Sequence, residues 1–82
     1  MTDQEILETL TRILSNVLED PSITLTLETT RPEVPRWDSF ANVTFIIAVE
    51  AEFGIKFRLI DLESFQTVGD IVNQIKALKS QS

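Results

Sequence analysis

One stretch of the sequence decides the fold, DSFANVTFIIAVEAEFG at residues 38–54, because both of its ends carry helix signals. Asp38 suits the N-cap position, where a carboxylate accepts hydrogen bonds from the free N–H groups of the first turn. Gly54 suits the position after the last turn, which commonly takes a left-handed backbone. We therefore expect a helix from about Ser39 to Phe53.

The apolar residues of this expected helix are too many for one buried face. The stripe that fits a core is formed by Phe45, Val49 and Phe53. Val43, Ile46 and Ile47 widen the apolar surface well beyond this stripe, so we expect some of them to be exposed. If the stripe faces inward, Val43 and Ile47 lie on the same exposed side as Ser39 and could dock a partner. The alternative is that they simply fill the core.

Amphipathic helices are expected on both sides of this stretch. The first begins at a capping box, Thr2 with Glu5 three residues later, and should stop at Asp20-Pro21, because a residue before proline is pushed out of helical backbone. The last begins at a second box, Thr67 with Asp70. The buried stripe of the first contains Ile6, Leu7, Leu10, Ile13, Leu14, Val17 and Leu18. That of the last contains Val68, Ile71, Val72, Ile75 and Leu78.

The segments between these helices are expected to be irregular. Residues 22–27 and 55–59 alternate apolar and polar side chains, which could indicate strands, but no hairpin turn joins them. We interpret both as extended loops whose apolar side chains plug a helical core. Pro32 and Pro35 should keep residues 28–37 extended. With a short helix around residues 61–65, the fold class is all-α, a small four-helix bundle with a long loop between its first two helices.

The composition excludes most kinds of chemistry. The 82 residues include no Cys, His or Tyr, so disulfides, thiolate catalysis and histidine general bases are absent. No metal site is expected. A catalytic site made of carboxylates alone would need a concave pocket, for which so small a core leaves little room. We expect a protein that is not an enzyme.

The charge of the chain limits its partners. Thirteen acidic and seven basic residues give a net charge of −6. Such a surface repels nucleic-acid phosphates and anionic lipids, and it is steered toward basic patches on protein partners. The acids that we interpret as solvated more than as recognition charges are Glu50, Glu52, Asp61 and Glu63.

Length and hydropathy indicate one small domain over residues 1–82. The longest apolar run, residues 45–49, is far too short to span a bilayer, and acidic residues stand where a signal peptide would need a basic start. We expect a cytoplasmic monomer that neither enters a membrane nor binds nucleic acid. Residues 79–82 should form a frayed tail.

Ser39 stands at the start of the central helix, directly after its expected cap. A serine in the first turn faces unsatisfied backbone N–H groups and the positive end of the helix dipole. A phosphate esterified to its hydroxyl would be stabilised there. The position therefore suggests a modified serine, and the plain alternative is an ordinary serine at a helix start.

Three motifs in this order resemble the acyl carrier protein and peptidyl carrier protein family. They are Asp38-Ser39-Phe40 at the head of the central helix, Glu50-x-Glu52-Phe53-Gly54-Ile55 at its end, and Thr67-Val68-Gly69-Asp70-Ile71 opening the last helix. The corresponding patterns of the family are Asp-Ser-Leu, Glu-x-x-Phe-Gly-Ile and Thr-Val-Gly-Asp-Leu. The similarity covers nearly the whole chain.

The resemblance implies that Ser39 receives 4′-phosphopantetheine from coenzyme A, and that the thiol of this arm holds an acyl or aminoacyl group as a thioester. It implies a phosphopantetheinyl transferase, an acyl- or aminoacyl-loading ligase and downstream acyl-transferring enzymes as partners, in fatty-acid, polyketide, peptide or related specialised biosynthesis. Asp38 would cap the helix and help the transferase position its metal ion. The residues expected to contact partners are Phe40, Val43, Ile47 and Glu50.

The chain departs from the family pattern at two places. Trp37 stands where the family usually has a glycine-containing approach, and we interpret it as a partly buried anchor of the long loop, with a contact to the arm as the alternative. Phe40 replaces the usual Leu, and Ala41, Asn42 and Thr44 stand where fatty-acid carriers tend to present acids. These differences favour a specialised carrier. A competing hypothesis is an unmodified acidic helical adaptor that binds partners through the central helix.

Overall fold

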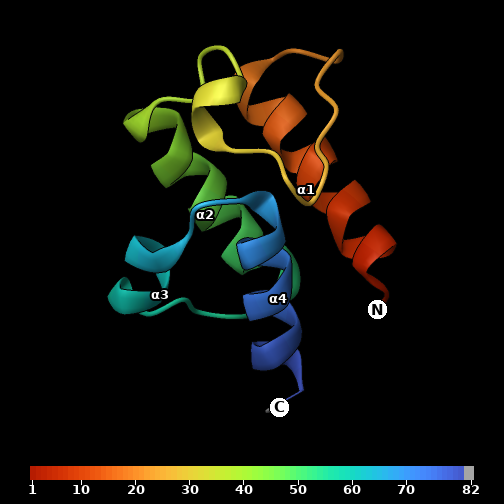
Figure 1. Cartoon of the computed structure of the whole chain (residues 1–82), viewed down its shortest axis with the longest axis vertical. Helices are drawn as coiled ribbons and strands as arrows, with labels where there is room; N and C mark the ends of the chain where they lie inside the picture. The colour runs from red at the N-terminus through yellow and green to blue at the C-terminus, as the bar shows by residue number, and fades with distance from the viewer. Residues whose placement is uncertain (81–82) are drawn as a thin grey trace.

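The computed structural model describes residues 1–80 and shows four α-helices and one turn of 3-10 helix (Figure 1). In chain order they are α1 (Asp3–Leu18), η1 (Arg31–Glu33), α2 (Ser39–Phe53), α3 (Leu59–Ser64) and α4 (Val68–Lys79). The described residues contain no β-strand, and a long loop joins α1 to α2. The predicted all-α, four-helix fold is confirmed. No helix within residues 1–80 is both long enough and apolar enough to cross a membrane.

Helix α1 begins at the predicted capping box and ends before the predicted stop. The Thr2 hydroxyl accepts the N–H of Glu5 at 3.1 Å, and the Glu5 carboxylate accepts the N–H of Thr2 at 2.7 Å. Leu18 is the last helical residue, because Glu19 takes a left-handed backbone with φ of 53° and its N–H donates back to carbonyls of the last turn. The helix therefore ends two residues before Asp20, without the help of the proline.

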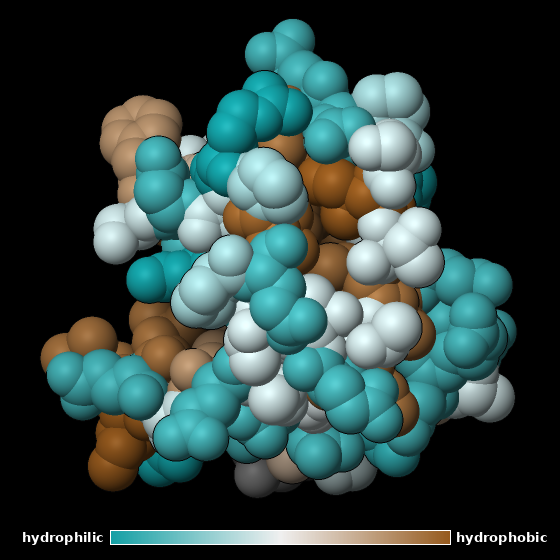
Figure 2. Space-filling view, turned by 45° about the horizontal axis from the view of Figure 1, so that its top comes forward, coloured by the Kyte–Doolittle hydropathy of each residue, from teal (hydrophilic) through white to brown (hydrophobic). Residues whose placement is uncertain are grey.

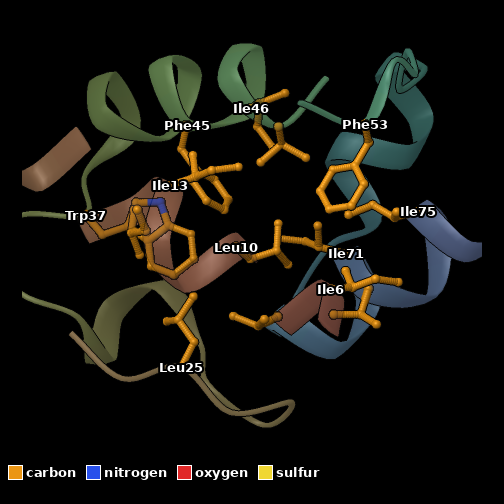
Figure 3. Packing of buried hydrophobic residues seen from close by; sticks show 14 of the residues in the cluster. Ile6, Leu10, Ile13, Leu25, Trp37, Phe45, Ile46, Phe53, Ile71 and Ile75 are labelled. Carbon is orange, nitrogen blue, oxygen red and sulfur yellow. The ribbon is translucent and has the colours of Figure 1, made fainter. Parts of the chain in front are cut away.

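Helix α2 spans the predicted residues and turns its predicted stripe into the core. Phe45, Val49 and Phe53 are buried, and Gly54 ends the helix with a left-handed backbone at φ of 66°. Figure 3 shows Phe45, Ile46 and Phe53 pointing toward apolar side chains of α1 and α4. The partners drawn there are Ile6, Leu10 and Ile13 from α1 and Ile71 and Ile75 from α4.

The segments interpreted as extended loops fill the core less completely than predicted. Leu25 and Phe57 are buried, but Leu27 and Leu59 are exposed. Leu59 faces solvent because it is the first residue of α3 and not part of a loop. Pro32 also departs from the prediction of extended backbone, since it lies inside η1, where a proline in the first turn is well tolerated.

The long loop is held against the start of α4 by backbone hydrogen bonds. The N–H of Val68 donates to the carbonyl of Thr29, and the N–H of Gly69 donates to the carbonyl of Leu27, both at 2.8 Å. A Cβ atom at position 69 would lie 2.8 Å from that Leu27 oxygen, which is closer than such contacts normally come. A glycine is needed there because only a residue without a Cβ permits this approach.

Helix α4 begins at the predicted Thr67–Asp70 capping box and ends at Lys79. Lys79, predicted to start a frayed tail, is helical, and its ammonium donates to the carbonyl of Phe53 at 3.1 Å. Lys76 pairs with Asp3 at 2.7 Å and so joins the end of α4 to the start of α1, which lie at one end of the molecule in Figure 1. Ser80, also in the predicted tail, caps the end of α4 by donating its N–H to the Lys76 carbonyl at 3.1 Å, and residues 81–82 of that tail lie outside the described residues.

The contact at position 69 predicts that Gly69→Ala destabilises the protein. Alanine has a better helix propensity than glycine, which by itself would stabilise α4. The clash of its Cβ with the Leu27 oxygen should outweigh this gain, so we expect a net loss of about 1–3 kcal/mol in the free energy of unfolding. Urea denaturation followed by circular dichroism measures it. Asn73→Ala, at an exposed position of the same helix, is the control and should not lower stability. Equal stability of Gly69→Ala and wild type would contradict the contact.

Candidate functional site

Ser39 is the first residue of α2, and its side chain is exposed. Directly before it, the Asp38 carboxylate accepts the N–H of Ala41 at 2.8 Å, which is the predicted N-cap. Within the described residues, the Ser39 hydroxyl makes no hydrogen bond. It therefore stands free at the positive end of a 15-residue helix.

The long loop is anchored just before this serine by Trp37. The indole is buried, at 6% exposure, and packs edge-on against Phe45 with the ring centroids 5.4 Å apart. Its Nε1–H donates to the side-chain oxygen of Asn42 at 3.1 Å, so burial leaves no polar atom unsatisfied. Arg36 turns the chain into this position with a left-handed backbone at φ of 70°. The predicted anchoring role of Trp37 is confirmed, and it fixes the position of Ser39.

The side of α2 next to Ser39 carries an exposed apolar surface without charge. Phe40 is 84% exposed, Val43 58% and Ile47 62%, whereas Ile46 is buried. These three exposed residues, called the apolar face below, lie on one side of the helix by their spacing. No charged residue occurs between positions 39 and 49. The prediction that part of this apolar surface is exposed is confirmed.

Glu50, predicted to contact partners, makes a hydrogen bond inside the fold. Its carboxylate accepts the N–H of Phe57 at 2.8 Å, and its side chain is half-buried. This bond ties the α2–α3 connection to the end of α2. Glu52 is exposed and pairs with Arg12 of α1 at 3.5 Å. A partner contact by Glu50 would therefore compete with an internal hydrogen bond.

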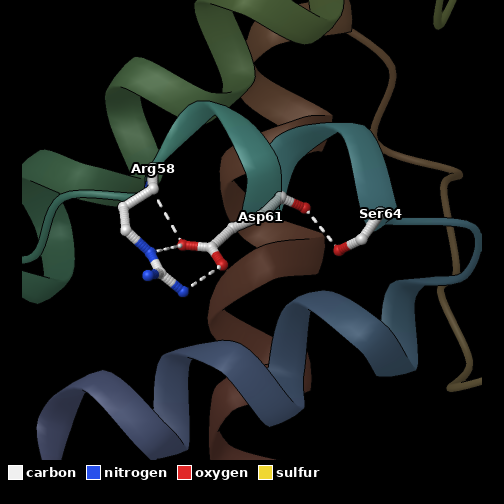
Figure 4. Close-up of polar contacts among 3 residues, drawn as sticks. All are labelled: Arg58, Asp61 and Ser64. Atoms are coloured by element: carbon white, nitrogen blue, oxygen red, sulfur yellow. Dashed lines mark hydrogen bonds and ion pairs between the residues drawn. The ribbon is translucent and has the colours of Figure 1, made fainter.

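Helix α3 is held at its start by Arg58 and Asp61 (Figure 4). Asp61 Oδ2 accepts the Arg58 backbone N–H at 2.9 Å, and Oδ1 accepts from the guanidinium at 3.2 Å. Ser64 closes the helix by donating its hydroxyl to the Asp61 carbonyl at 2.7 Å. The interpretation of Asp61 as a solvated acid is wrong, since the residue is only 8% exposed. This cap also explains why α3 begins at Leu59, two residues earlier than predicted.

The hydrogen bonds from Arg58 hold the pKa of the Asp61 carboxyl below its usual value. The side-chain hydrogen bond from the guanidinium is the largest cause, and the backbone N–H adds to it. Because the folded-state pKa is depressed, the stabilising contribution is complete above the unfolded pKa of about 4. It is lost as the pH falls through the lower folded-state value.

Two further apolar residues are exposed on α3, where sequence reasoning placed none. Leu59 is 71% exposed and Ile60 is 65% exposed. In Figure 2, apolar atoms project from the molecule on the side where Figure 1 places α3, and others lie recessed between hydrophilic side chains near the centre. The early start of α3 explains the failure, because Leu59, assigned to an extended loop, and Ile60, assigned to no element, form the first turn of this helix.

A pocket of about 340 Å³ lies between the long loop, α2, α3 and the start of α4. Its apolar lining is formed by Pro32, Trp37, Ile46, Leu62, Phe65, Val68 and Ile71. Its polar and charged lining is formed by Thr29, Arg31, Asn42, Gln66 and Thr67. Sequence reasoning did not find this pocket, because its walls come from four segments that only the fold brings together.

The described residues give the Ser39 hydroxyl no catalytic partner. The Ser39 hydroxyl has no hydrogen-bonded base in the described structure to activate it as a nucleophile. Among residues 1–80, no three His, Cys, Asp or Glu side chains are placed to hold a metal ion. The site thus presents an accessible hydroxyl on a rigid helix end beside an apolar face.

The cap of α3 predicts that Asp61→Asn loosens this helix. The substitution removes the charge-assisted hydrogen bonds to Arg58, so we expect the protection of the Leu62 amide, which donates to the Arg58 carbonyl, to fall roughly tenfold at neutral pH. Hydrogen exchange measures it. Glu63→Gln removes an exposed carboxylate from the same helix and should leave this protection unchanged. Equal protection in both variants would show that the ion pair does not hold α3.

A solved protein structure resembles this chain in sequence and fold. No family model matches the chain. A solution NMR structure of holo acyl carrier protein from Geobacter metallireducens superposes with a TM-score of 0.86. Its sequence is 33% identical, over 93% of this chain and 87% of that one. Similarity of sequence and fold over this share of both chains shows the family. The chain belongs to the acyl carrier protein family.

Proposed function

We propose that this protein carries an acyl or aminoacyl group on a 4′-phosphopantetheine arm attached to Ser39. The arm, once attached, supplies a thiol that holds the cargo as a thioester. In the attachment step, the Ser39 hydroxyl oxygen bonds to the phosphorus that carries the pantetheine part of coenzyme A. The bond from this phosphorus to the bridging oxygen of the diphosphate breaks, the nucleotide part leaves with that oxygen, and the hydroxyl proton is released. The observation that carries the proposal is the exposed, unbonded Ser39 hydroxyl at the start of α2, in a chain that belongs to the acyl carrier protein family.

The residues around Ser39 fit a phosphate ester. The first turn of α2 has backbone N–H groups that lack intrahelical partners, and the Asp38 carboxylate takes that of Ala41. The others and the helix dipole favour a phosphate at this end. Burial of Trp37 holds the attachment point rigid relative to the core. The solvent-exposed hydroxyl is open to a modifying enzyme.

Asp38 has two roles in this proposal. It caps α2, and a cap of this type is worth about 1 kcal/mol. Its carboxylate is exposed and lies one residue from the hydroxyl to be modified. We propose that it also helps a phosphopantetheinyl transferase to place its metal ion during arm transfer.

The apolar face next to Ser39 is the proposed docking surface for partner enzymes. These are the phosphopantetheinyl transferase, a ligase that loads the cargo, and enzymes that remove it. An apolar surface free of charge can be covered by a partner without desolvating an ion. The absence of acids between positions 39 and 49, in the first part of α2, favours a specialised carrier over a housekeeping fatty-acid carrier. Glu50 adds to docking only if its bond to Phe57 opens.

The proposal assigns no catalytic step to the chain itself, since the cofactor and the partner enzymes supply the chemistry. A cytoplasmic location and a monomeric state stay predictions. The competing adaptor hypothesis shares the apolar face but requires no modification of Ser39. The two hypotheses differ in what Ser39→Ala does, because an adaptor without the hydroxyl keeps its activity and a carrier loses it.

Arm transfer to Ser39 gives the direct test. We expect the purified apoprotein, incubated with coenzyme A, Mg²⁺ and a broad-specificity phosphopantetheinyl transferase, to gain the mass of one phosphopantetheinyl group. Intact-mass spectrometry measures the gain. Ser39→Ala should gain nothing, and Ser22→Ala, which removes an exposed hydroxyl from the long loop, should gain the arm normally. No gain in the wild type, or a gain in Ser39→Ala, would sink the proposal.

Docking through the apolar face predicts that Val43→Asp slows arm transfer. The new carboxylate would be buried against an apolar partner surface, so we expect kcat/KM for the transferase to fall roughly tenfold or more. The fold should be unchanged in circular dichroism, because Val43 is exposed. Asn73→Asp adds the same charge on the exposed side of α4 and is the control. Equal rates for the two variants would show that the apolar face is not in contact with the transferase.

A further inference from the structure

The pocket beside α2 lies next to the proposed attachment site. Asn42 and Ile46, which line it, follow Ser39 by three and seven residues on one helix. Side chains at these spacings share a face of the helix. A group attached to Ser39 can therefore turn down this face into the pocket, with Trp37 forming part of the wall.

Among residues 1–80, Arg31 is the one charged side chain that lines this pocket, and no acid of this range lines it. In the described structure the Arg31 guanidinium has neither an ion pair nor a hydrogen bond. Its neighbour Glu33 is already engaged, because its carboxylate accepts from both the N–H and the hydroxyl of Thr30 at 2.7 and 2.8 Å. Other basic residues do form ion pairs, among them Arg12, Arg36, Arg58 and Lys76. Arg31 is therefore a positive charge at the pocket that no carboxylate of the described structure neutralises, although the chain has a net charge of −6.

The remaining polar lining complements this cation. Gln66 adds a side-chain amide to the same pocket, whereas the hydroxyl oxygens of Thr29 and Thr67 already accept the N–H groups of Thr26 and Asp70. The oxygen of the Asn42 amide is occupied by the Trp37 N–H, which leaves its NH₂ group able to donate to a carbonyl oxygen of the cargo or of the arm. The apolar side chains opposite can hold a short carbon chain. The lining thus matches a chain with a carbonyl at one end and an anion at the other.

We infer that this pocket takes an acyl cargo that ends in a carboxylate, with Arg31 as its counter-ion. The inference rests on the proposed function and names the class of its cargo as dicarboxylic acids bound through one thioester. A guanidinium can bind a carboxylate with two parallel hydrogen bonds. A cargo with a methyl end offers Arg31 no hydrogen-bond acceptor and would gain nothing from it.

The chain contains its own reporter for the test, because Trp37 is its single tryptophan, it has no tyrosine, and this residue lines the pocket. The protein would be loaded through a broad-specificity phosphopantetheinyl transferase with adipoyl-coenzyme A or hexanoyl-coenzyme A, which have carbon chains of equal length. Two quantities would be measured on each form, the emission of Trp37 and the rate constant for cleavage of the thioester by hydroxylamine. Arg31→Gln removes the counter-ion. Arg36→Gln makes the same charge change in the same loop but outside the pocket, so it is the control.

For the adipoyl form, we expect cleavage to be roughly tenfold slower in wild type than in Arg31→Gln, with a change of Trp37 emission that the variant lacks. The hexanoyl form should react alike in both proteins, and Arg36→Gln should behave as wild type. Each cleavage rate is compared between wild type and variant for the same cargo, so a difference in intrinsic reactivity between the two thioesters does not affect the result.

Equal adipoyl cleavage rates and equal emission in wild type and Arg31→Gln would overturn the inference. The inference would also be overturned if the Arg31-dependent change of Trp37 emission were already complete in the holo protein without cargo. Arg31 would then pair with the phosphate of the arm and not with the cargo. A protein that carries the arm on Ser39 but shows either result leaves the proposed function intact. An unchanged intact mass after loading would contradict the proposed function and this inference together.

Discussion

The fixed position of the start of α2 is the constraint on which the rest of the structure depends. Trp37 is buried against Phe45 and bonded to Asn42, and directly after it Asp38 caps the helix. The contacts of Trp37 tie the long loop to the core, and the Asp38 carboxylate satisfies a backbone N–H that has no partner within the helix. Together they hold Ser39 at a helix end with its hydroxyl in solvent. The apolar face then lies beside Ser39 on the same helix, and α2 also contributes Asn42 and Ile46 to the wall of the pocket.

The composition limits what the surfaces of the protein can do. Without Cys, His or Tyr the chain has few groups with which to catalyse a reaction, and a carrier needs none. Acidic residues give the molecule its negative charge, yet the exposed part of α2 nearest Ser39 carries no charge. Partners that meet this face would recognise shape and apolar contact there, and long-range attraction would come from acids elsewhere.

The sequence predicted the parts of the fold that depend on local rules. The capping boxes at Thr2 and Thr67 and the cap at Asp38 satisfy backbone groups a few residues away, so they can be recognised from spacing alone. Contacts beyond these local rules decided what the sequence did not predict. Glu50 became an internal acceptor because the next loop returns to it. The bond of Asp61 to Arg58 is local, but it was missed because arginine is not among the usual N-cap residues. The pocket could not be foreseen, since no local pattern shows which distant segments will form its walls.

The central claim is that Ser39 is the attachment point of a phosphopantetheine arm in the living cell. The most direct measurement is intact-mass spectrometry of the protein purified from the cells that make it, followed by fragmentation to locate any added group. The account predicts a population heavier by one phosphopantetheinyl group, with or without an acyl cargo, and with the added mass on the peptide that contains Ser39. A protein found only at its unmodified mass under conditions in which its pathway is active, or modified at another residue, would contradict it.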